Sequence, residues 1–428
     1  MTFIRLLLPL LLLAGCVSAG PRRESLDSIA PDYVKLQLAI GEKEEGYIDA
    51  YYGPPEWQAE AKTSAAAVPE LAARAGVLMV RLRSLPDSRL EPIERRRRDF
   101  LLAQLKAASI RLRMMQGEKL PFSDEAEGLF GVRPALKPLA AYDPVLARIE
   151  RLVPGSGPLS DRVDAFQERF TIARDRLEPV MRAAIAECRR RTLEHIPLPP
   201  NERFTLEFVT GKSWGGYNWY KGDANSLIQV NTDLPIRVSR AVDLGCHEGY
   251  PGHHVYNALL EEKLARARGW VEFTIYPLYS PQSFIAEGSA NYGIELAFPG
   301  DDQLEFETRT LYPLAALPTA SARQYLGLQE ALRELAGARF TIAADYLDGR
   351  ISRAQAVELT RKYQLVSPLR AEKSVAFTDQ YRSYVINYGL GLDMVRAAVE
   401  RAGADPSARW AAMARILSEP TLPTDLAR

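Results

Sequence analysis

The chain has 428 residues, and its 54 Lys and Arg residues balance 54 Asp and Glu residues, which gives a formal net charge of +0. Because no basic excess exists to contact phosphates, nucleic acid is not expected as a partner. Hydrophobic residues at 47% and charged residues at 25% are typical of a folded protein and exclude a disordered one. Three cysteines exclude a disulfide scaffold, and with only four histidines any histidine cluster is informative.

The N-terminal segment has the pattern of a bacterial export signal. Arg5 is the only charged residue before an apolar run over 6–14, and this run is shorter than the ~20 residues that a membrane-spanning helix needs. A Leu-Ala-Gly triplet precedes Cys16, an order that resembles the lipoprotein signal, in which the cysteine is lipidated and becomes the mature N-terminus. We predict a signal peptide at 1–15 and a lipidated N-terminus and tether at 16–25; a plain signal peptide that contains a cysteine is the alternative.

A lipid on Cys16 places the protein in the bacterial envelope. Several acyl chains on one cysteine anchor a protein firmly without a spanning helix. By resemblance to lipoprotein sorting, Val17 rather than Asp after the cysteine favours the outer membrane. We expect the body to face the periplasm and to contact the membrane through its lipid. That compartment permits disulfides, and the sequence leaves open whether Cys188 and Cys246 form one.

Apolar residues recur at helical spacing along most of the chain. Val163, Phe166 and Phe170, for example, are three and four positions apart, which indicates one face of a helix. The basic run 95–98 is flanked by acidic residues, so we interpret it as exposed helix surface and not as a nucleic-acid patch. Long helices are predicted over 27–46, 68–85, 91–116, 158–195 and 320–347.

A short β region is expected to interrupt the helices near residue 200. Residues 196–201 contain three prolines, which break the helical pattern, and apolar and polar residues then alternate over 204–208. A stretch rich in Gly and aromatic residues leads to 227–232, which has a second strand pattern. We therefore expect a mostly α fold with a small β-sheet near residues 203–232.

The proline-rich break divides the chain into an N-terminal helical part, 26–200, and a catalytic part, 201–428. The first part carries no motif of its own, and the second carries all the candidate chemistry described below. We expect the two parts to form one continuous unit. No sequence feature indicates the oligomeric state.

Three of the four histidines lie within eight residues, in the string His-Glu-Gly-Tyr-Pro-Gly-His-His at 247–254. Neutral imidazoles are good zinc ligands, and an adjacent carboxylate is the usual base in zinc hydrolysis. On a regular helix the six positions from His247 to His253 give ~240° of rotation and ~9 Å of rise. Ligands of one tetrahedral zinc lie only ~3.3 Å apart. A regular helix therefore cannot bring these two imidazoles onto one ion.

The residues between the two histidines offer a way around this spacing. Pro251 has no N–H to donate to the carbonyl of His247, and Gly249 and Gly252 tolerate unusual backbone angles. We predict a local bulge that loops out two residues and brings His247 and His253 onto one ion. In that geometry Glu248 faces the water on the metal.

The motif resembles two families of zinc peptidases. H-E-x-x-x-G-H is similar to the variant zinc motif of the dipeptidyl peptidase III family. The fuller string resembles more closely a large, poorly characterised bacterial family with H-E-x-x-P-G-H-H signatures, assigned to zinc peptidases of the glutamate-ligand type. The resemblance covers about 200–400. It implies a multi-helix, zincin-like peptidase body that binds one Zn²⁺ per chain.

In such families a glutamate on a later helix is the third zinc ligand. The segment 284–292 matches the family pattern E-G-x-A-x-Y, which makes Glu287 that ligand, with Glu295 as the fallback. Asn291, one turn after Glu287, is a candidate to hold a ligand, although related enzymes often have Asp there. Asp243, one turn before His247, is another candidate for the same role.

Further candidates lie near the C-terminus. The string Asn-Tyr-Gly-Leu-Gly at 387–391 resembles a Y-x-x-G segment of the family, so Tyr388 is expected to donate to the oxyanion, with Tyr384 as its rival. Packing is the alternative role of either tyrosine. Arg370 and Lys373 are candidates to bind a peptide carboxylate.

The two remaining histidines have weaker assignments. His254 is expected to bind substrate or to support a ligand, or else to replace His253 if the bulge differs. His195 ends a predicted helix before the proline-rich break and is expected to be structural.

The sequence thus predicts a lipid-anchored zinc peptidase that hydrolyses short peptides. His247, His253 and Glu287 hold zinc, and Glu248 takes a proton from the attacking water and passes it to the leaving amine. The strand pattern at 227–232 is expected to bind the substrate backbone by strand addition. The alternatives are a zinc hydrolase of a non-peptide amide or ester, and a non-catalytic envelope lipoprotein that binds metal or a protein.

Overall fold

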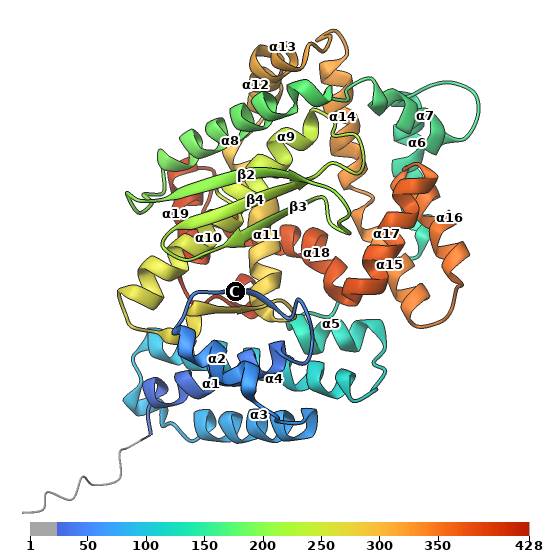
Figure 1. Cartoon of the computed structure of the whole chain (residues 1–428). Coiled ribbons are helices and arrows are strands. Elements are labelled where there is room, and N and C mark those ends of the chain that lie inside the picture. Colours follow the sequence, from blue (N-terminus) through green and yellow to red (C-terminus); the bar gives the residue numbers. More distant parts are fainter. Residues whose placement is uncertain (1–23, 428) are drawn as a thin grey trace, which may run out of the picture.

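The computed structural model describes residues 24–427, so the predicted signal peptide and the lipidation site Cys16 lie outside the described residues. Helices make up most of this part of the chain, and two small sheets complete it (Figure 1). The expected mostly α fold with a small sheet is therefore confirmed. Within residues 24–427, no helix combines the length and the apolar character needed to cross a bilayer.

The N-terminal helices form a layer at one end of the molecule, blue to cyan in Figure 1. The first helix begins after Ser25, whose hydroxyl accepts a hydrogen bond from the backbone N–H of Ser28 at 3.3 Å and so caps the helix. Within the layer α1 packs against α2, α3 and α4, and α4 packs against α3 and α5. They are α1 (Leu26–Gly41), α2 (Pro55–Thr63), α3 (Val68–Arg83), α4 (Pro92–Met115) and α5 (Phe122–Phe130).

One residue of the basic run on α4 corrects the expectation of an exposed surface. Arg97 is only 2% exposed, and its guanidinium donates to both carboxylate oxygens of Glu272, at 2.5 and 3.0 Å. Glu272 is itself buried, so the two charges compensate each other away from water. This ion pair joins the N-terminal layer to the part at 201–428.

The two sheets lie between this layer and the helices beyond it. Strands β2 (Arg203–Val209), β3 (Gly216–Tyr220) and β4 (Asn225–Asn231) form a sheet of order β2-β4-β3, in which β2 is parallel and β3 antiparallel to β4. Strands β1 (Ile48–Tyr51) and β5 (Ile275–Pro277) form a second, antiparallel pair. The part at 26–200 therefore supplies one strand to a sheet that the part at 201–428 completes.

The order of the larger sheet corrects the expectation of strand addition at 227–232. Strand β4 contains most of this segment and is the central strand, so neighbours occupy both of its hydrogen-bonding edges. Strand β3 is instead an edge strand and contacts the helical turn that carries His247. A peptide that adds a strand to this sheet next to His247 would therefore pair with β3.

The helix expected over 158–195 is interrupted. Thr171 forms a β-bridge with Arg237, and the N–H of Ile172 donates to the carbonyl of Ile236 at 2.9 Å. This pairing takes the backbone out of the helical conformation at 171–172, between a helix that ends at Glu168 and one that begins at Leu177. The region consists of α6 (Asp143–Leu152), α7 (Leu159–Glu168) and α8 (Leu177–Leu193).

The helix expected over 320–347 is likewise two helices. At their junction the N–H of Leu335 donates to the carbonyl of Leu332, a tighter turn than the α-helical one. The helices of this region are α12 (Asp302–Phe306), α13 (Tyr312–Ala315), α14 (Ala322–Arg333), α15 (Ala336–Leu347), α16 (Arg353–Gln364) and α17 (Pro368–Tyr381).

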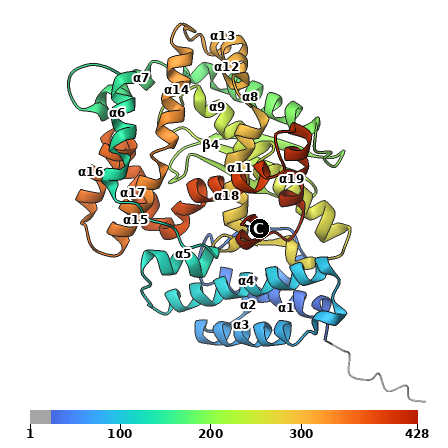
Figure 2. The same cartoon turned by 180° about the vertical axis from the view of Figure 1, so that it is seen from behind.

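Helix α11 (Pro281–Ala297) runs through the middle of the molecule and is nearly all buried (Figure 2). Helices α18 (Ile386–Glu400) and α19 (Pro406–Ser418) pack against it, and the chain ends with α20 (Pro423–Leu426). The remaining helices of the centre are α9 (Ser239–Leu244) and α10 (His253–Leu260). The candidate chemistry lies where α11 meets the segment between α9 and α10.

Candidate metal centre

The segment between α9 and α10 does not form a continuous bulged helix. After α9 the chain makes a π-helical turn, η4 (Gly245–Gly249), then leaves the helix with Tyr250 in an extended conformation, and a new helix begins at His253. The predicted deformation is present, but as a break of three residues between two helices. This break changes the direction of the chain between the two histidines.

Gly252 makes the break possible. Its N–H donates to the carbonyl of Cys246 at 3.0 Å, which folds the chain back over the π-helical turn. A Cβ at this position would lie 1.8 Å from the carbonyl oxygen of His247, a distance that no side chain tolerates. The backbone can therefore fold back only with glycine here.

The fold-back brings two imidazoles and one carboxylate together. The Nε2 atoms of His247 and His253 are 3.1 Å apart, and Oε2 of Glu287 lies 3.2 Å from the first and 3.8 Å from the second. These separations are close to the ~3.3 Å expected between ligands of one tetrahedral zinc. Oε2 of Glu287 is buried and has no hydrogen-bond partner among the described residues. The three side chains thus fit a metal ion, which would satisfy that oxygen.

Burial and mutual contact set the pKa values of these groups. Burial lowers the pKa of His253 to about 4 and keeps that imidazole neutral. Burial alone would raise the pKa of Glu287 and lower that of His247, but the contact between the two groups reverses both shifts. The lowered pKa values of His253 and Glu287 favour a neutral imidazole and an ionised carboxylate, which are the protonation states that bind a metal.

Glu248 lies beside the three candidate ligands. It is 4% exposed and lines the same narrow pocket of about 60 Å³. Burial raises the pKa of Glu248 to about 7; the carboxylates of Glu287 and Asp49 add to the rise, and His247 opposes it. Asn218 of β3 donates to its backbone carbonyl at 2.7 Å and fixes its position. A buried carboxylate with a pKa near neutrality can take up and return a proton.

The two candidate tyrosines have different contacts. The hydroxyl of Tyr384 donates to Oε1 of Glu287 at 2.8 Å, so it orients a candidate ligand. The ring of Tyr388 stacks on the imidazole of His247, with 6.3 Å between ring centroids, and lines the pocket. Its hydroxyl makes no hydrogen bond to any residue in 24–427 and is therefore free to contact a substrate.

Helices α11 and α18 approach each other closely next to the contact between Tyr384 and Glu287. Gly288 of α11 and Gly391 of α18 lie back to back: a Cβ on Gly288 would be 2.6 Å from the backbone of Gly391. No larger residue allows the helices to approach so closely. The glycines in the two strings that resemble the peptidase family thus have a packing role next to the site.

Asp49 is a member of the pocket that the sequence did not reveal. It lies on β1 at an irregular step in the pairing with β5, between Ile48 and Ala50, and such steps redirect side chains. Its carboxylate accepts a hydrogen bond from the hydroxyl of Tyr217 and lines the same narrow pocket. Burial raises the pKa of Asp49 to about 7. No motif marks this residue, because its role depends on a strand far away in sequence.

His254 lies in a separate, fully buried cluster. Its Nδ1 is 2.8 Å from the hydroxyl of Ser226, and its Nε2 is 3.1 Å from Oε2 of Glu202. Glu202 also accepts a hydrogen bond from the hydroxyl of Tyr250. Both nitrogens of His254 are therefore engaged, and the expected roles in substrate binding or metal ligation are not supported.

The other candidates occupy more peripheral positions. The side chain of Asn291 donates to the backbone carbonyl of Glu287 at 2.8 Å and not to a ligand atom. Asp243 forms an ion pair with Arg240. The fallback ligand Glu295 is paired with Arg396 at 2.6 Å, outside the group of three.

Three further candidates, His195, Arg370 and Lys373, lie outside the narrow pocket that holds the candidate ligands. His195 stacks on Trp410 with 4.7 Å between ring centroids, which agrees with the structural role expected for it. Arg370 donates to the backbone carbonyl of Pro235, whereas Lys373 is paired with Asp233 at 2.9 Å.

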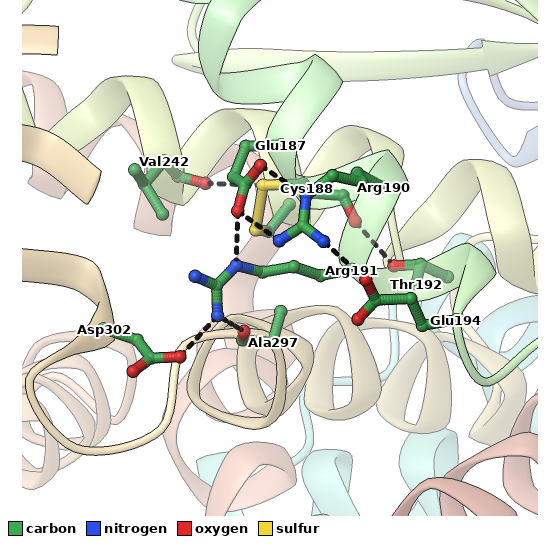
Figure 3. A network of polar contacts seen from close by, with 10 residues as sticks. Glu187, Cys188, Arg190, Arg191, Thr192, Glu194, Val242, Ala297 and Asp302 are labelled. Carbon is green, nitrogen blue, oxygen red and sulfur yellow. Dashed lines mark hydrogen bonds and ion pairs between the residues drawn. A yellow bond between two sulfur atoms is a disulfide. The ribbon is translucent and has the colours of Figure 1, made fainter. Parts of the chain in front are cut away.

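A disulfide joins Cys188 of α8 to Cys246 of the π-helical turn. Its two Cα atoms are 5.4 Å apart, and Cys246 directly precedes His247. Around it, Arg191 bonds Glu187 and Asp302, as Figure 3 shows. The question that the sequence left open is thus answered, and the turn that carries the first candidate ligand is tied covalently to α8.

Comparison with known proteins gives only distant structural likenesses. No family model and no curated protein matches the chain. The chain is similar to a crystal structure named "putative lipoprotein from Colwellia psychrerythraea", with 17% identity and a TM-score of 0.47 over 83% of this chain and 67% of that one. It is also similar to the M32 carboxypeptidase from Deinococcus radiodurans R1, with 13% identity and a TM-score of 0.39 over 91% and 87%. Similarity at this level assigns neither a family nor an activity.

Proposed function

We propose that this chain is a zinc-dependent peptidase. The observation that carries the proposal is the group His247, His253 and Glu287, whose ligand atoms lie 3.1 to 3.8 Å apart. One of these atoms, Oε2 of Glu287, is buried and has no hydrogen bond to a described residue. Two imidazoles, one carboxylate and an open position are typical of catalytic and not of structural zinc sites. Zinc in such a site, when bound, makes water more acidic and polarises a carbonyl.

Glu248 is the proposed base. Its carboxylate lies in the pocket with the candidate ligands, within reach of a water that attacks a peptide carbonyl there. It takes a proton from this water and returns it to the leaving amine. Storage of a metal does not require such a base, so its presence beside the ligands favours hydrolysis over a non-catalytic role.

Tyr388 is the proposed oxyanion donor. Tyr384 is already bonded to Glu287, while the hydroxyl of Tyr388 is free and faces the same pocket. A hydrogen bond from Tyr388 to the carbonyl oxygen would stabilise the negative charge that develops there as water attacks.

Strand β3 is the proposed support for the peptide backbone. It is an edge strand whose first residues, Gly216 to Asn218, line the narrow pocket. An extended peptide that pairs with this edge would lie along the pocket with its carbonyl near Glu248. This choice of a peptide separates the proposal from hydrolysis of a small amide or ester, which needs no such edge.

A lipid on Cys16 remains the proposed anchor, with the body facing the periplasm. The disulfide next to His247 supports a compartment outside the cytoplasm, because disulfides persist in oxidising environments.

The test is a zinc assay and a peptide digest on the same protein. We expect about one zinc per chain, cleavage of a mixed peptide library, and loss of both after treatment with a chelator. Glu248→Gln is expected to keep zinc and lose cleavage, whereas the matched variant Glu295→Gln, on the outer part of α11, keeps both. A zinc-loaded protein that cleaves small esters but no peptide would overturn the assignment as a peptidase.

A further inference from the structure

A second, larger cavity opens beside the narrow metal pocket. Its volume is about 520 Å³, within the range of sites that hold ligands the size of a short peptide. The two cavities share His247, Glu248 and Tyr388 in their walls, so they lie next to each other. We call the larger one the basic chamber, because its lining includes Lys212, Arg237, Arg240, Arg339, Arg370 and Lys373 but only three acidic residues, Asp233, Asp243 and the shared Glu248.

Three of these cations are already paired with carboxylates. Arg237 forms ion pairs with Asp164 and Glu168. Arg240 is paired with Asp243, and Lys373 is paired with Asp233. Lys212 is exposed to solvent. Arg339 and Arg370 are left as guanidinium groups within the chamber that have no ion pair with any residue in 24–427.

Arg339, on α15, is the stronger candidate of the two to bind an anion. Its guanidinium carbon lies 5.1 Å from the ring centroid of Phe377 and 6.0 Å from that of Tyr388. Rings that flank a guanidinium orient it without using its N–H donors. Its Nε is buried and has no hydrogen-bond partner among the described residues. The donors of this group are thus available beside Tyr388, the residue that stacks on His247.

Arg370 supplies a second cation to the same chamber. The one hydrogen bond of its guanidinium to a described residue is to the backbone carbonyl of Pro235, which is uncharged. Burial lowers the pKa values of both Arg339 and Arg370, and the neighbouring Arg237 lowers that of Arg370 further. Both groups therefore gain from a bound anion.

The narrow pocket, which all three candidate ligands line, has the opposite character. Its lining includes three carboxylates, those of Asp49, Glu248 and Glu287, and contains neither lysine nor arginine. The two cavities therefore differ in charge: Asp49 lines the narrow pocket, Arg339 lines the basic chamber, and the candidate ligand His247 lines both. A peptide with free ends is a molecule with the complementary polarity, cationic at its amino end and anionic at its carboxyl end.

We propose that Arg339, with Arg370, binds the free C-terminal carboxylate of the peptide substrate, so that the protein removes a short C-terminal segment. This inference rests on the proposed peptidase function and deepens it. The planar guanidinium matches a carboxylate through two parallel hydrogen bonds. The chain then runs from the acidic pocket to the basic chamber. Hydrolysis breaks one C–N bond, adds OH to the carbonyl carbon and H to the leaving nitrogen, and leaves the terminal carboxylate unchanged.

The test compares one peptide in three forms, with the full-length zinc-loaded protein. The forms are a hexapeptide with a free carboxylate, the same peptide with a C-terminal amide, and the amide with Glu at its last position. Mass spectrometry identifies the bond that is cut and gives kcat/KM. We expect cleavage near the C-terminus and a loss of about 10- to 100-fold on amidation, the usual cost of losing a hydrogen bond between charged groups.

Variants assign this loss to the chamber. Arg339→Met should lose a similar factor on the free acid and almost nothing on the amide, with the change in KM, and Arg339→Lys should recover part of it. Arg361→Met removes an equal charge from α16, outside the chamber, and should behave like the unaltered protein. Because amidation changes only the substrate, the comparison does not depend on how well any variant folds.

Specific outcomes would overturn the inference. Equal cleavage of acid and amide, or equal losses on both in Arg339→Met, would remove the carboxylate from recognition. Full recovery by the amide that ends in Glu would assign the chamber to acidic side chains and not to the chain end. Absence of cleavage of any form, or cleavage that survives Glu248→Gln, would instead contradict the proposed function itself.

Discussion

Two buried clusters of histidine and carboxylate lie next to each other and differ in what they leave unsatisfied. His253 belongs to the candidate metal centre, where Oε2 of Glu287 has no hydrogen bond among the described residues. The next residue, His254, is bonded through both nitrogens to Ser226 and Glu202. The residue types and the burial are similar. A buried polar atom left without a hydrogen bond in one cluster is what distinguishes a site that can hold an ion from one that only stabilises the fold.

The largest expected effect separates the two histidines. His253→Ala should reduce bound zinc from about one per chain to background and abolish hydrolysis, because two ligands remain where three are needed. His254→Ala should keep zinc and lower the free energy of unfolding by about 3 kcal/mol or more, since it removes one partner of the buried Glu202 carboxylate. Zinc analysis after dialysis and urea denaturation measure the two effects. Loss of zinc from a folded His254→Ala protein would show that the clusters are not independent.

The next effect separates the two tyrosines. Tyr388→Phe should lower kcat by about 100- to 1,000-fold with zinc retained, because it removes a donor to the oxyanion. Tyr384→Phe should weaken zinc binding by about 10- to 100-fold, because it removes the hydrogen bond that orients Glu287. Steady-state kinetics at saturating zinc and competition with a chelator distinguish the two. The reverse pattern would exchange the roles assigned here.

The smallest effect concerns the second cluster and pH. Burial would raise the pKa of Glu202, but hydrogen bonds from His254, Tyr250 and Arg189 outweigh it and hold the pKa at about 2. Because this pKa lies below its ordinary value of 4.5, the carboxylate stabilises the folded chain above about pH 4.5. That contribution is lost as the pH falls from about 4.5 towards 2.

Glu202→Gln isolates this contribution from the other carboxylates. The stability difference between the unaltered protein and the variant, measured by urea denaturation from pH 6 to pH 2.5, should shrink as the pH falls. A difference that stays constant over this range would mean that folding does not shift the pKa of Glu202.

The sequence anticipated the parts of the molecule that depend on local pattern. Helical periodicity and the proline-rich break predicted a mostly α fold with a sheet near 203–232, and the structure has both. The string at 247–254 and the glutamate at 287 predicted the group that the structure brings together. Local pattern was sufficient there because the spacing of the histidines and the positions of the glycines restrict the backbone strongly.

The sequence could not anticipate what depends on contacts between distant segments. Asp49 joins the pocket through pairing of β1 with β5, more than 200 positions later. Arg97 is buried only because Glu272 lies opposite it, and Arg339 faces Tyr388 from a helix that carries no motif. The break at 171–172 likewise depends on pairing with 236–238. Helical periodicity cannot predict any of these features, because each depends on where a residue distant in sequence lies in the folded chain.

X-ray absorption spectroscopy of the zinc-loaded protein tests the central claim most directly, because it counts the ligands of the bound ion. The account predicts that the ion in the unaltered protein has two imidazole nitrogens and a carboxylate oxygen as ligands at about 2.0–2.2 Å, and no sulfur. Any zinc that remains bound to His253→Ala should have one imidazole ligand fewer. A spectrum with sulfur ligands, or with a single imidazole in the unaltered protein, would contradict the assignment of His247, His253 and Glu287 to one metal ion.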